Sequence, residues 1–327
     1  MKELQYVLTD QMVAMIADIA ELIGKLSSTG FFSPDVSCLH KNRLLQVYGS
    51  LKLDNSTLSL AQIAGFMDGK RVKIPMGKDD VEGAAGIYGF LNELDPYKVE
   101  DLLTAHRIMM HTQAAAMCGF RKCPSRVNYN QAQTAFSEAT PEEIPQLVAN
   151  LLFWAQGSDA HPLLKSCVVH CELMLIRPFY DGNGRISRFW QTLILSKYKD
   201  AFAWLPVEAY VNEHRDEYLQ SIAKAQSDGL KTDFIIYMLA AIKTALKLAW
   251  SRETESAGLT AKEAERWSQI QDYLAIHGNI SNANVRSMFH VSSATANRIL
   301  TLYHKKRLLE RVFISNHVGY IQGKHQP

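Results

Sequence analysis

The sequence has few of the features that mark membrane proteins or disulfide-stabilised proteins. Its longest apolar stretches fall short of the roughly 18 residues that a membrane span needs, and its first residues lack the layout of a signal peptide. The chain has five cysteines, an odd number, and no Cys/His set has zinc spacing, which argues against a disulfide framework and a zinc site. We therefore expect a protein of the reducing cytoplasm without a membrane partner.

Internal repeats and low-complexity segments are also missing, and the composition is that of an ordinary globular protein. Hydrophobic residues make up 47% of the chain and charged residues 21%, and the length suggests two or three domains. The net charge of +2 is distributed unevenly, because nine Lys or Arg and four Asp or Glu follow residue 260, a local charge of +5. The basic excess therefore lies in the last fifth of the chain.

Apolar residues recur at helical spacing along most of the chain, so we predict a mainly α fold. The exception is 119–140, where Val127 and Tyr129 belong to a group of β-formers between turn residues and predict a short β-hairpin flap. The pattern divides the chain into an N-terminal helical region at 1–98, a core at 99–250, a polar linker at 251–260 and a C-terminal module at 261–327.

The C-terminal module has the pattern of a winged helix-turn-helix. Helices are predicted at 261–276, 282–289 and 293–306, with a tight turn before the last one and two short strands after it. Polar and basic residues on or after the last helix could contact DNA, namely Ser293, Asn297, Arg298, Lys305 and Lys306. The alternative is a winged helix that serves only protein contact or the formation of a homodimer.

The segment 178–188 has the chemistry of a phosphate-binding loop. It reads Pro-Phe-Tyr-Asp-Gly-Asn-Gly-Arg-Ile-Ser-Arg. Gly182 and Gly184 let the backbone approach a phosphate, and the helix that follows adds its positive N-terminal end. Arg185 and Arg188 are three residues apart and lie on one helix face, so both can reach a polyphosphate.

Two other side chains of this loop fit the same purpose. Asp181 offers a hard oxygen ligand suited to Mg²⁺, and the apolar Phe179 would anchor the loop in the core. The alternative is a helix N-terminus with a solvated turn and surface arginines, because short glycine motifs are weak evidence. We prefer a phosphate site because all eleven residues fit one design.

The loop resembles the signature of Fic proteins, His-Pro-Phe-x-x-Gly-Asn-Gly-Arg-x-x-Arg. The likeness covers roughly residues 36–248 and includes Gly119, Phe120, Arg121 and Val127, which resemble the entrance of the Fic flap. It implies a Fic-type helical core. Fic enzymes mostly transfer AMP from ATP to a protein hydroxyl, so the resemblance implies ATP or a related nucleotide as ligand, Mg²⁺, and a target protein that could be the chain itself.

The resemblance also assigns roles within the loop. Asp181 would hold Mg²⁺, and Arg188 would clamp the γ-phosphate. The flap from Gly119 to Tyr129 would align a target segment by strand addition. The nucleotide site would include Phe179 and an anion hole for the α- and β-phosphates formed by Gly182, Asn183, Gly184 and Arg185.

Arg177 stands where the signature has its catalytic histidine. A general base needs a pKa near neutrality, whereas a guanidinium stays protonated and has no acceptor lone pair. Loss of such a base typically lowers the rate by about 10² to 10⁴. The chain could be a nucleotide-binding pseudoenzyme, an enzyme that uses the site differently, or an engineered or selected inactive copy. A further alternative is a non-enzymatic, DNA-binding transcriptional regulator that senses a nucleotide.

A helix predicted at about 42–55 resembles the inhibitory helix of class II Fic proteins, whose motif is Ser/Thr-x-x-x-Glu-Gly/Asn. Ser50, Asp54 and Asn55 occupy the motif positions. The resemblance implies that Asp54 pairs with Arg188 and blocks the γ-phosphate. Because aspartate is one methylene shorter than glutamate, Asp54 could instead pair with Arg177. Without the signature, the same residues would be interpreted as a helix end and a cap.

Overall fold

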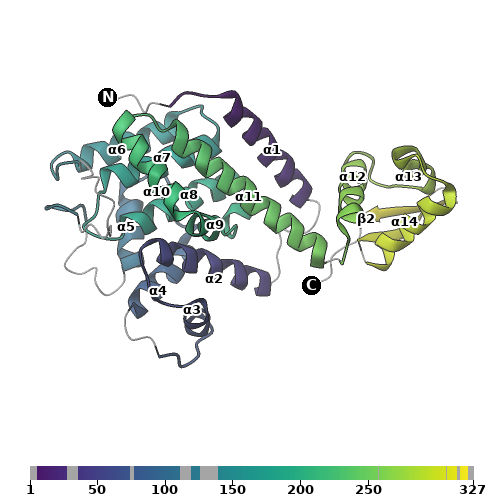
Figure 1. Cartoon of the computed structure of the whole chain (residues 1–327), viewed down its shortest axis with the longest axis horizontal. Helices are drawn as coiled ribbons and strands as arrows, with labels where there is room; N and C mark the ends of the chain where they lie inside the picture. Colours follow the sequence, from purple (N-terminus) through teal and green to yellow (C-terminus); the bar gives the residue numbers. More distant parts are fainter. Residues whose placement is uncertain are drawn as a thin grey trace. The chain divides into compact units, whose positions relative to one another are not determined.

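The structure is a computed structural model of the whole chain, and it describes residues 6–27, 36–73, 77–110, 119–125, 139–256, 258–306, 308–314 and 317–322. Its helices and strands are α1 (Asp10–Ser27), α2 (Val36–Leu53), α3 (Leu60–Met67), α4 (Lys78–Gly86), η1 (Ile87–Phe90), α5 (Val99–Met110), α6 (Ile144–Gly157), α7 (Pro162–Ile176), α8 (Asn183–Tyr198), η3 (Asp200–Ala203), α9 (Val207–Glu213), α10 (Arg215–Asp228), α11 (Thr232–Ser256), α12 (Ala261–His277), α13 (Asn282–Phe289), α14 (Ser293–Lys305), β1 (Leu309–Ile314) and β2 (His317–Gln322). The predicted mainly α fold is thereby confirmed (Figure 1).

The chain divides into two compact units. Met1–Asp18 and Val36–Ala245 form the first, and Ile19–Asp35 and Leu246–Pro327 form the second. α11 continues to Ser256, so it extends into the stretch that the sequence predicted as a linker. No proline or glycine interrupts the chain there before Gly258, and the helix therefore has no local reason to stop earlier.

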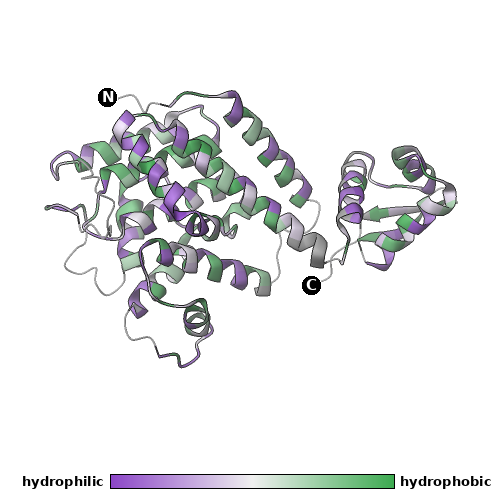
Figure 2. Ribbon diagram, in the orientation of Figure 1, coloured by the Kyte–Doolittle hydropathy of each residue, from purple (hydrophilic) through white to green (hydrophobic). Residues whose placement is uncertain are grey.

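The core of the first unit is built around α7 and α8. α7 is buried on nearly all sides, from Leu163 to Ile176, and Trp190 of α8 is fully buried. A helix that is apolar all round belongs in the interior of a fold, and Figure 2 shows hydrophobic residues concentrated on the central helices of this unit. A short connection, residues 177–182, joins α7 to α8. The residues of this connection therefore lie at one end of this buried helix pair.

Two glycines let neighbouring helices of the first unit approach one another closely. A Cβ atom at Gly49 of α2 would lie 2.5 Å from the carbonyl oxygen of Glu208 on α9. A Cβ atom at Gly83 of α4 would lie 2.0 Å from the carbonyl oxygen of Met109 on α5. Since no side-chain atom fits so close to a backbone atom, glycine is needed at both contacts. These contacts help to fix the positions of α2 and α4 in the first unit.

The second unit has its own small core. Trp267 of α12 and Tyr303 of α14 pack with their ring centroids 5.1 Å apart. β1 and β2 pair antiparallel, from Leu309 opposite Gln322 to Ile314 opposite His317. The elements follow the predicted order of helix, helix, turn, helix and two strands. Each of the three helices begins after a capping residue whose side chain accepts a hydrogen bond from the first turn. The interpretation of this unit as a winged helix stays a prediction.

Two further expectations concern the flap and membranes. Residues 126–138, with Val127 and Tyr129, lie outside the described residues, and 119–125 form bends rather than a strand. The expectation that no apolar stretch is long enough for a membrane span was wrong by length and composition: within the described chain, Thr232–Ser251 of α11 is long and apolar enough, but half of this stretch is buried inside the fold, as in core helices. The expectation that there is no membrane partner stays a prediction.

Candidate functional site

The loop between α7 and α8 is closed by its own hydrogen bonds. Arg177 ends α7 in the left-handed conformation, with φ at 51°, and Gly182 precedes α8 with φ at 78°. The side chain of Asn183 bridges both backbone groups of Phe179: its Oδ1 accepts from the amide at 2.9 Å, and its Nδ2 donates to the carbonyl at 2.7 Å. Because Phe179 is fully buried, the loop is anchored in the core, and its exposed part has a fixed shape.

His106 of α5, which the sequence did not single out, contacts the loop at Phe179 and Asp181. Its ring stacks on that of Phe179, with centroids 3.7 Å apart and planes inclined by 3°. His106 Nε2 lies 2.9 Å from the carbonyl oxygen of Asp181, and because a carbonyl only accepts, this nitrogen carries the hydrogen. Burial lowers the pKa of His106 to about 4, so the ring is neutral at neutral pH.

The start of the predicted flap is attached to the same loop. The backbone N–H of Arg121 donates to the carbonyl of Pro178 at 2.9 Å, and its buried guanidinium donates to the carbonyl of Arg177 at 2.7 Å. Gly119 adopts a φ of 109°, and the ring of Phe120 lies 6.0 Å from that of Phe179. Of the four residues predicted at the flap entrance, Gly119, Phe120 and Arg121 are therefore beside the loop, and Val127 lies outside the described residues.

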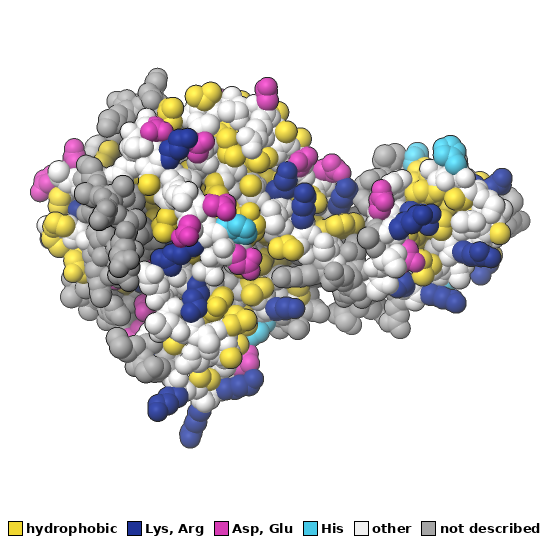
Figure 3. Space-filling view, viewed as in Figure 1, with side chains coloured by type: hydrophobic (Ala, Val, Ile, Leu, Met, Phe, Trp, Pro, Cys, Tyr) yellow, Lys and Arg dark blue, Asp and Glu magenta, His cyan; other side chains and the backbone are white. Residues whose placement is uncertain are grey.

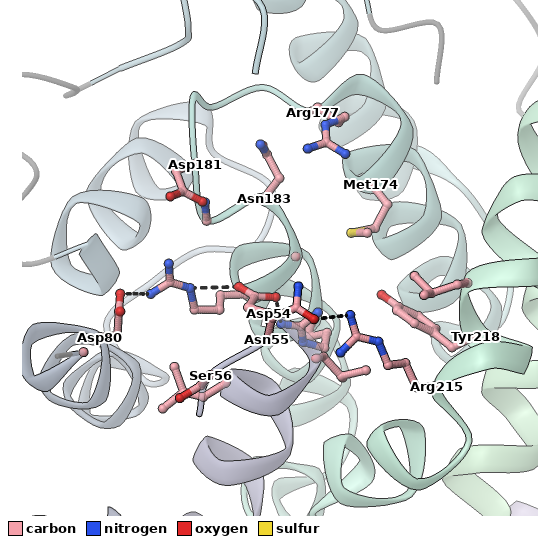
Figure 4. A pocket seen from close by; sticks show the side chains of 18 of the residues that line it. Asp54, Asn55, Ser56, Asp80, Met174, Arg177, Asp181, Asn183, Arg215 and Tyr218 are labelled. Carbon is pink, nitrogen blue, oxygen red and sulfur yellow. Dashed lines mark hydrogen bonds and ion pairs between the residues drawn. The ribbon is translucent and has the colours of Figure 1, made fainter. Parts of the chain in front are cut away.

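Arg185 and Arg188 project from the first turns of α8 into a group of acidic side chains. Both are nearly fully buried, at 6% and 4% exposed. The carboxylate of Asp54 bridges them, with Oδ1 2.7 Å from Arg188 and Oδ2 3.0 Å from Arg185. Asp80 at the start of α4 lies 2.7 Å from Arg185. Figure 4 shows Asp54 and Asp80 on opposite sides of one guanidinium.

α2 holds Arg188 through more than its carboxylate. Arg188 Nε donates to the hydroxyl of Ser50 at 3.0 Å, and a terminal nitrogen donates to the Ser50 carbonyl at 2.9 Å. Burial opposes the charge of Arg188, but Asp54 and Tyr218 outweigh it and raise the pKa above the ordinary arginine value. The pairing of Asp54 with Arg188 is the one that the sequence motif suggested, and the second pairing, with Arg185, was not expected.

Arg215, at the start of α10, holds the end of α2 from another side. It donates to the carbonyl of Lys52 at 3.0 Å. It also donates to the side-chain oxygen of Asn55 at 2.8 Å, the contact drawn in Figure 4. Asn55 adopts a left-handed conformation, with φ at 66°, which asparagine tolerates better than most residues. No sequence motif identified Arg215.

These groups surround one cavity of about 510 Å³, a size in the range of small-molecule sites, roughly 300 to 1,000 Å³. At Gly184 a Cβ atom would lie 2.8 Å from Asp54 Oδ1, so the loop backbone closely approaches the position of the carboxylate. The charged residues of the wall are Arg177, Arg185, Arg188, Arg215, Asp54, Asp80 and Asp181. A cavity with four guanidiniums and a glycine-rich helix N-terminus is suited to a polyanion.

Part of the chain that forms this site matches a known family. Residues 96–195, from just before α5 into α8, match the Fic/DOC family. The chain contains a Fic domain. The crystal structure of a Fic family protein from Desulfovibrio desulfuricans G20 is similar to almost the whole chain, with a TM-score of 0.73 and 29% identity over 98% of this chain and 99% of that one.

Other relatives match part of this chain. The protein adenylyltransferase fic-1 of Caenorhabditis elegans is 26% identical over 61% of this chain and 40% of its own length. The protein adenylyltransferase Fic of Culex quinquefasciatus is 23% identical over 63% of this chain and 42% of its own. This chain therefore spans about two fifths of the length of these curated relatives.

A magnesium site in the Fic domain would depend on Asp181. One carboxylate oxygen of Asp181 accepts from the amide of Gly182 at 2.7 Å, which turns the side chain toward the glycine-rich loop. No group of three or more metal-ligating side chains occurs among the described residues. Mg²⁺ is commonly held by one or two carboxylates together with substrate phosphates and water. A single aspartate beside a phosphate site therefore fits this ion.

The residues predicted to contact DNA lie in the second unit, apart from the Fic domain in sequence. Arg298 and Lys305 are exposed on α14. Ser293 donates to the side chain of Asn282 on α13, which in turn donates to Asn297 at 2.6 Å. The Lys306 amine donates to the carbonyl of Gly258 and so contributes to its own unit. The exposed cations therefore fit a contact surface better than Lys306 does.

Proposed function

We propose that the Fic domain of this chain binds ATP or a related nucleotide with Mg²⁺ and is an AMP-transfer scaffold for protein hydroxyls. The observation that carries the proposal is the pair of buried arginines, Arg185 and Arg188, on the helix that follows the glycine-rich loop. Relatives named protein adenylyltransferase support the choice of AMP transfer among phosphate chemistries. The cytoplasmic location expected from the sequence, like a target protein, belongs to the proposal.

The proposed binding mode assigns each phosphate to residues of the loop. The backbone of Gly182, Asn183 and Gly184, together with Arg185, receives the α- and β-phosphates at the N-terminus of α8. Asp181 holds the magnesium ion, which would neutralise charge on the phosphate oxygens. Arg188 receives the γ-phosphate, because it is the other buried guanidinium on the same helix face.

Asp54 currently takes the position that this ligand requires. Its two oxygens contact the two guanidiniums as the oxygens of a phosphate would. ATP can therefore bind to Arg188 in this way only if the Asp54 carboxylate leaves. We propose that this contact is an inhibitory one and that it lowers the affinity for the triphosphate.

Arg177 would lower the rate of transfer by a separate route. It lies at the end of α7 and lines the cavity, and its Nε donates to the Ser125 hydroxyl at 2.8 Å. The guanidinium binds anions but cannot take the proton from an attacking hydroxyl. The proposal is therefore a nucleotide-binding site whose transfer activity is weak or absent.

The test of this function is the Arg177→His variant. With labelled ATP and Mg²⁺ it should transfer label to itself or to a protein in a cell extract, about 10² to 10⁴ times faster than the parent chain. The matched control combines Arg177→His with Asp181→Ala, which should abolish labelling because the proposed Mg²⁺ ligand is gone. The absence of label from every protein, with or without Asp54→Ala, would rule out AMP transfer.

A second function rests on the C-terminal unit. The segment after residue 260 has a charge of +5, and on the face shown in Figure 3 lysine and arginine side chains outnumber acidic ones in this unit. Arg298 and Lys305 are exposed on α14. We infer a DNA-binding module, so that the chain would be a regulator that senses a nucleotide, and a homodimer is the assembly we would expect if the module instead serves protein contact.

A further inference from the structure

Three guanidiniums converge on one short segment at the end of α2. Arg185 and Arg188 come from α8 and contact the carboxylate of Asp54, while Arg215 comes from α10 and contacts the Lys52 carbonyl and the Asn55 side chain. All three arginines also line the same cavity. The end of α2 therefore serves as a shared acceptor for every one of these cations.

The geometry of this segment couples Asp54 to Arg215. α2 ends with the Asn55 amide donating to the Lys52 carbonyl at 3.0 Å and the Ser56 amide donating to the Leu51 carbonyl at 3.0 Å. Arg215 binds two oxygens on either side of Asp54 in the sequence, one from Lys52 and one from Asn55. Because these residues are so close in the chain, a movement of the α2 end that takes Asp54 away from the two α8 arginines would strain or break the hydrogen bonds of Arg215.

The hydrogen bonds of Arg215 are weaker than those it could make with a ligand. Both of its acceptors are neutral, a backbone carbonyl and an amide oxygen. A hydrogen bond from a guanidinium to a phosphate oxygen is charge-assisted and roughly twice as strong as a neutral one. Exchange of the α2 end for a phosphate chain would therefore be favourable at Arg215, and the phosphate chain would also replace Asp54 as the partner of the other two arginines.

The geometry points to Arg215 as a positioning residue with two alternating roles. In the closed site it latches the end of α2 and keeps Asp54 on Arg185 and Arg188, and in the open site it binds the phosphate chain. This inference rests on the proposed nucleotide binding. The ligand class is a nucleotide with at least two linked phosphates, because the proposed function already places different phosphates on Arg185 and on Arg188, and Arg215 lines the same cavity.

The affinity for Mg²⁺-ATP, measured by calorimetry in four full-length chains, tests this exchange. The chains are the parent, Arg215→Ala, Asp54→Ala and the double variant. In the parent, Arg215→Ala removes the latch, which raises the affinity for ATP, and a ligand-binding group, which lowers it. Because the two effects oppose each other, the affinity should change by less than about threefold. In the Asp54→Ala chain the substitution removes only the ligand-binding group, and the affinity should fall on the order of tenfold.

Arg215→Lys separates the two roles. Lysine keeps the charge but cannot hold two oxygens in a fixed fork, so the latch weakens while attraction to phosphate persists. It should raise the ATP affinity of the parent and lower that of the Asp54→Ala chain less than alanine does. AMP should bind weakly in all chains and show no coupling between the two positions.

Amide hydrogen exchange provides a readout of the latch without ligand. The peptide that covers Lys52–Ser56 should exchange several-fold faster in Arg215→Ala than in the parent, and ATP should accelerate the same peptide in the parent chain. Asp216→Ala, an exposed neighbour on α10, should leave this exchange unchanged.

The outcomes distinguish the latch from the proposed function. An equal factor for Arg215→Ala with and without Asp54, or unchanged exchange at the end of α2, would overturn the latch while nucleotide binding stands. No ATP binding in any of the four chains would overturn the proposed function and the latch with it.

Discussion

At the scale of single residues, Asp54 shows that a short acidic side chain can contact two arginines of α8. The inhibitory motif of class II Fic proteins has glutamate at this position, and the shorter aspartate left open a pairing with Arg177 instead of Arg188. The structure instead uses both carboxylate oxygens, one for Arg188 and one for Arg185. Two ion pairs to buried guanidiniums make the contact stronger than the side-chain length alone would indicate.

His106 yields a pH-dependent prediction at the same scale. Its pKa falls from 6.5 to about 4 on burial, so the unfolded chain binds more protons below pH 6.5. The free energy of unfolding should therefore be highest above pH 6.5 and decrease as the pH falls toward 4, by up to about 1.4 kcal/mol per pH unit for this one group. Urea unfolding at several pH values measures the slope.

The control for this prediction is His106→Phe, which keeps an aromatic ring against Phe179 but neither titrates nor donates to Asp181. It should be less stable than the parent at pH 8 and show a smaller decrease in stability on acidification. Part of the slope will remain, because burial also lowers the pKa of His170, to about 3. Identical slopes in the two chains would show that His106 does not titrate as the structure indicates.

At the scale of elements, the site is assembled by helices that meet at close contacts. α2 brings Asp54, α4 brings Asp80, α5 brings His106 and α10 brings Arg215 to the loop between α7 and α8. Each helix contributes only a few residues, and none of them forms the site alone. The positions of the charged groups therefore depend on how tightly neighbouring helices pack.

Two glycines of α4 give a matched test of this packing. A Cβ atom at Gly83 would lie 2.0 Å from the carbonyl oxygen of Met109, whereas a Cβ atom at Gly86 meets nothing within 4 Å. Gly83→Ala should lower the free energy of unfolding by about 1–3 kcal/mol or more. Gly86→Ala should raise it by about 0.4–1 kcal/mol, because the backbone there is already helical.

Thermal or urea unfolding of the two variants makes the comparison, and the affinity for ATP shows whether the helix has shifted. If Gly83→Ala moves α4, Asp80 no longer meets Arg185 in its present geometry and the ATP affinity changes as well. Equal stability of the two alanine variants would mean that α4 and α5 do not approach one another so closely.

At the scale of the whole molecule, two units carry two kinds of chemistry. The first unit contains the Fic domain and its cavity, and the second unit, which includes the residues after 245, carries the basic excess. The similarity to the Desulfovibrio desulfuricans Fic family protein extends over 98% of this chain, so the second unit is part of the likeness. A function for the chain as a whole must account for both units.

The DNA-binding proposal predicts an outcome for the full-length chain in a gel shift with duplex DNA at low salt. Arg298→Ala combined with Lys305→Ala should weaken binding and reduce its salt dependence by about one unit of log–log slope for each phosphate that the chain no longer neutralises. Arg107→Ala with Lys199→Ala removes the same charge from exposed positions of the first unit and should have little effect. Absence of binding by the parent chain at low salt would contradict the proposal.

The features that depend only on residues close together in the sequence could be predicted from the sequence alone. The loop at 178–188, the helical spacing and the charge after residue 260 are local patterns, and local patterns can be interpreted without a fold. The same holds for Arg177, because a guanidinium lacks an acceptor lone pair in any fold. These features were enough to predict a mainly α chain with a phosphate-binding loop, and the resemblance to the Fic signature added that the loop lacks its base.

The groups that meet at this loop from distant parts of the chain required the tertiary structure. Asp54 and Arg185 are 131 positions apart, Asp80 and Arg185 are 105 apart, and Asn55 and Arg215 are 160 apart. Their meeting depends on how α2, α4 and α10 pack around α8, and side-chain packing between distant segments leaves no periodic signal in a single sequence. For that reason the latch, the second acid and His106 emerged from the fold, whereas the loop they surround could be predicted from the sequence.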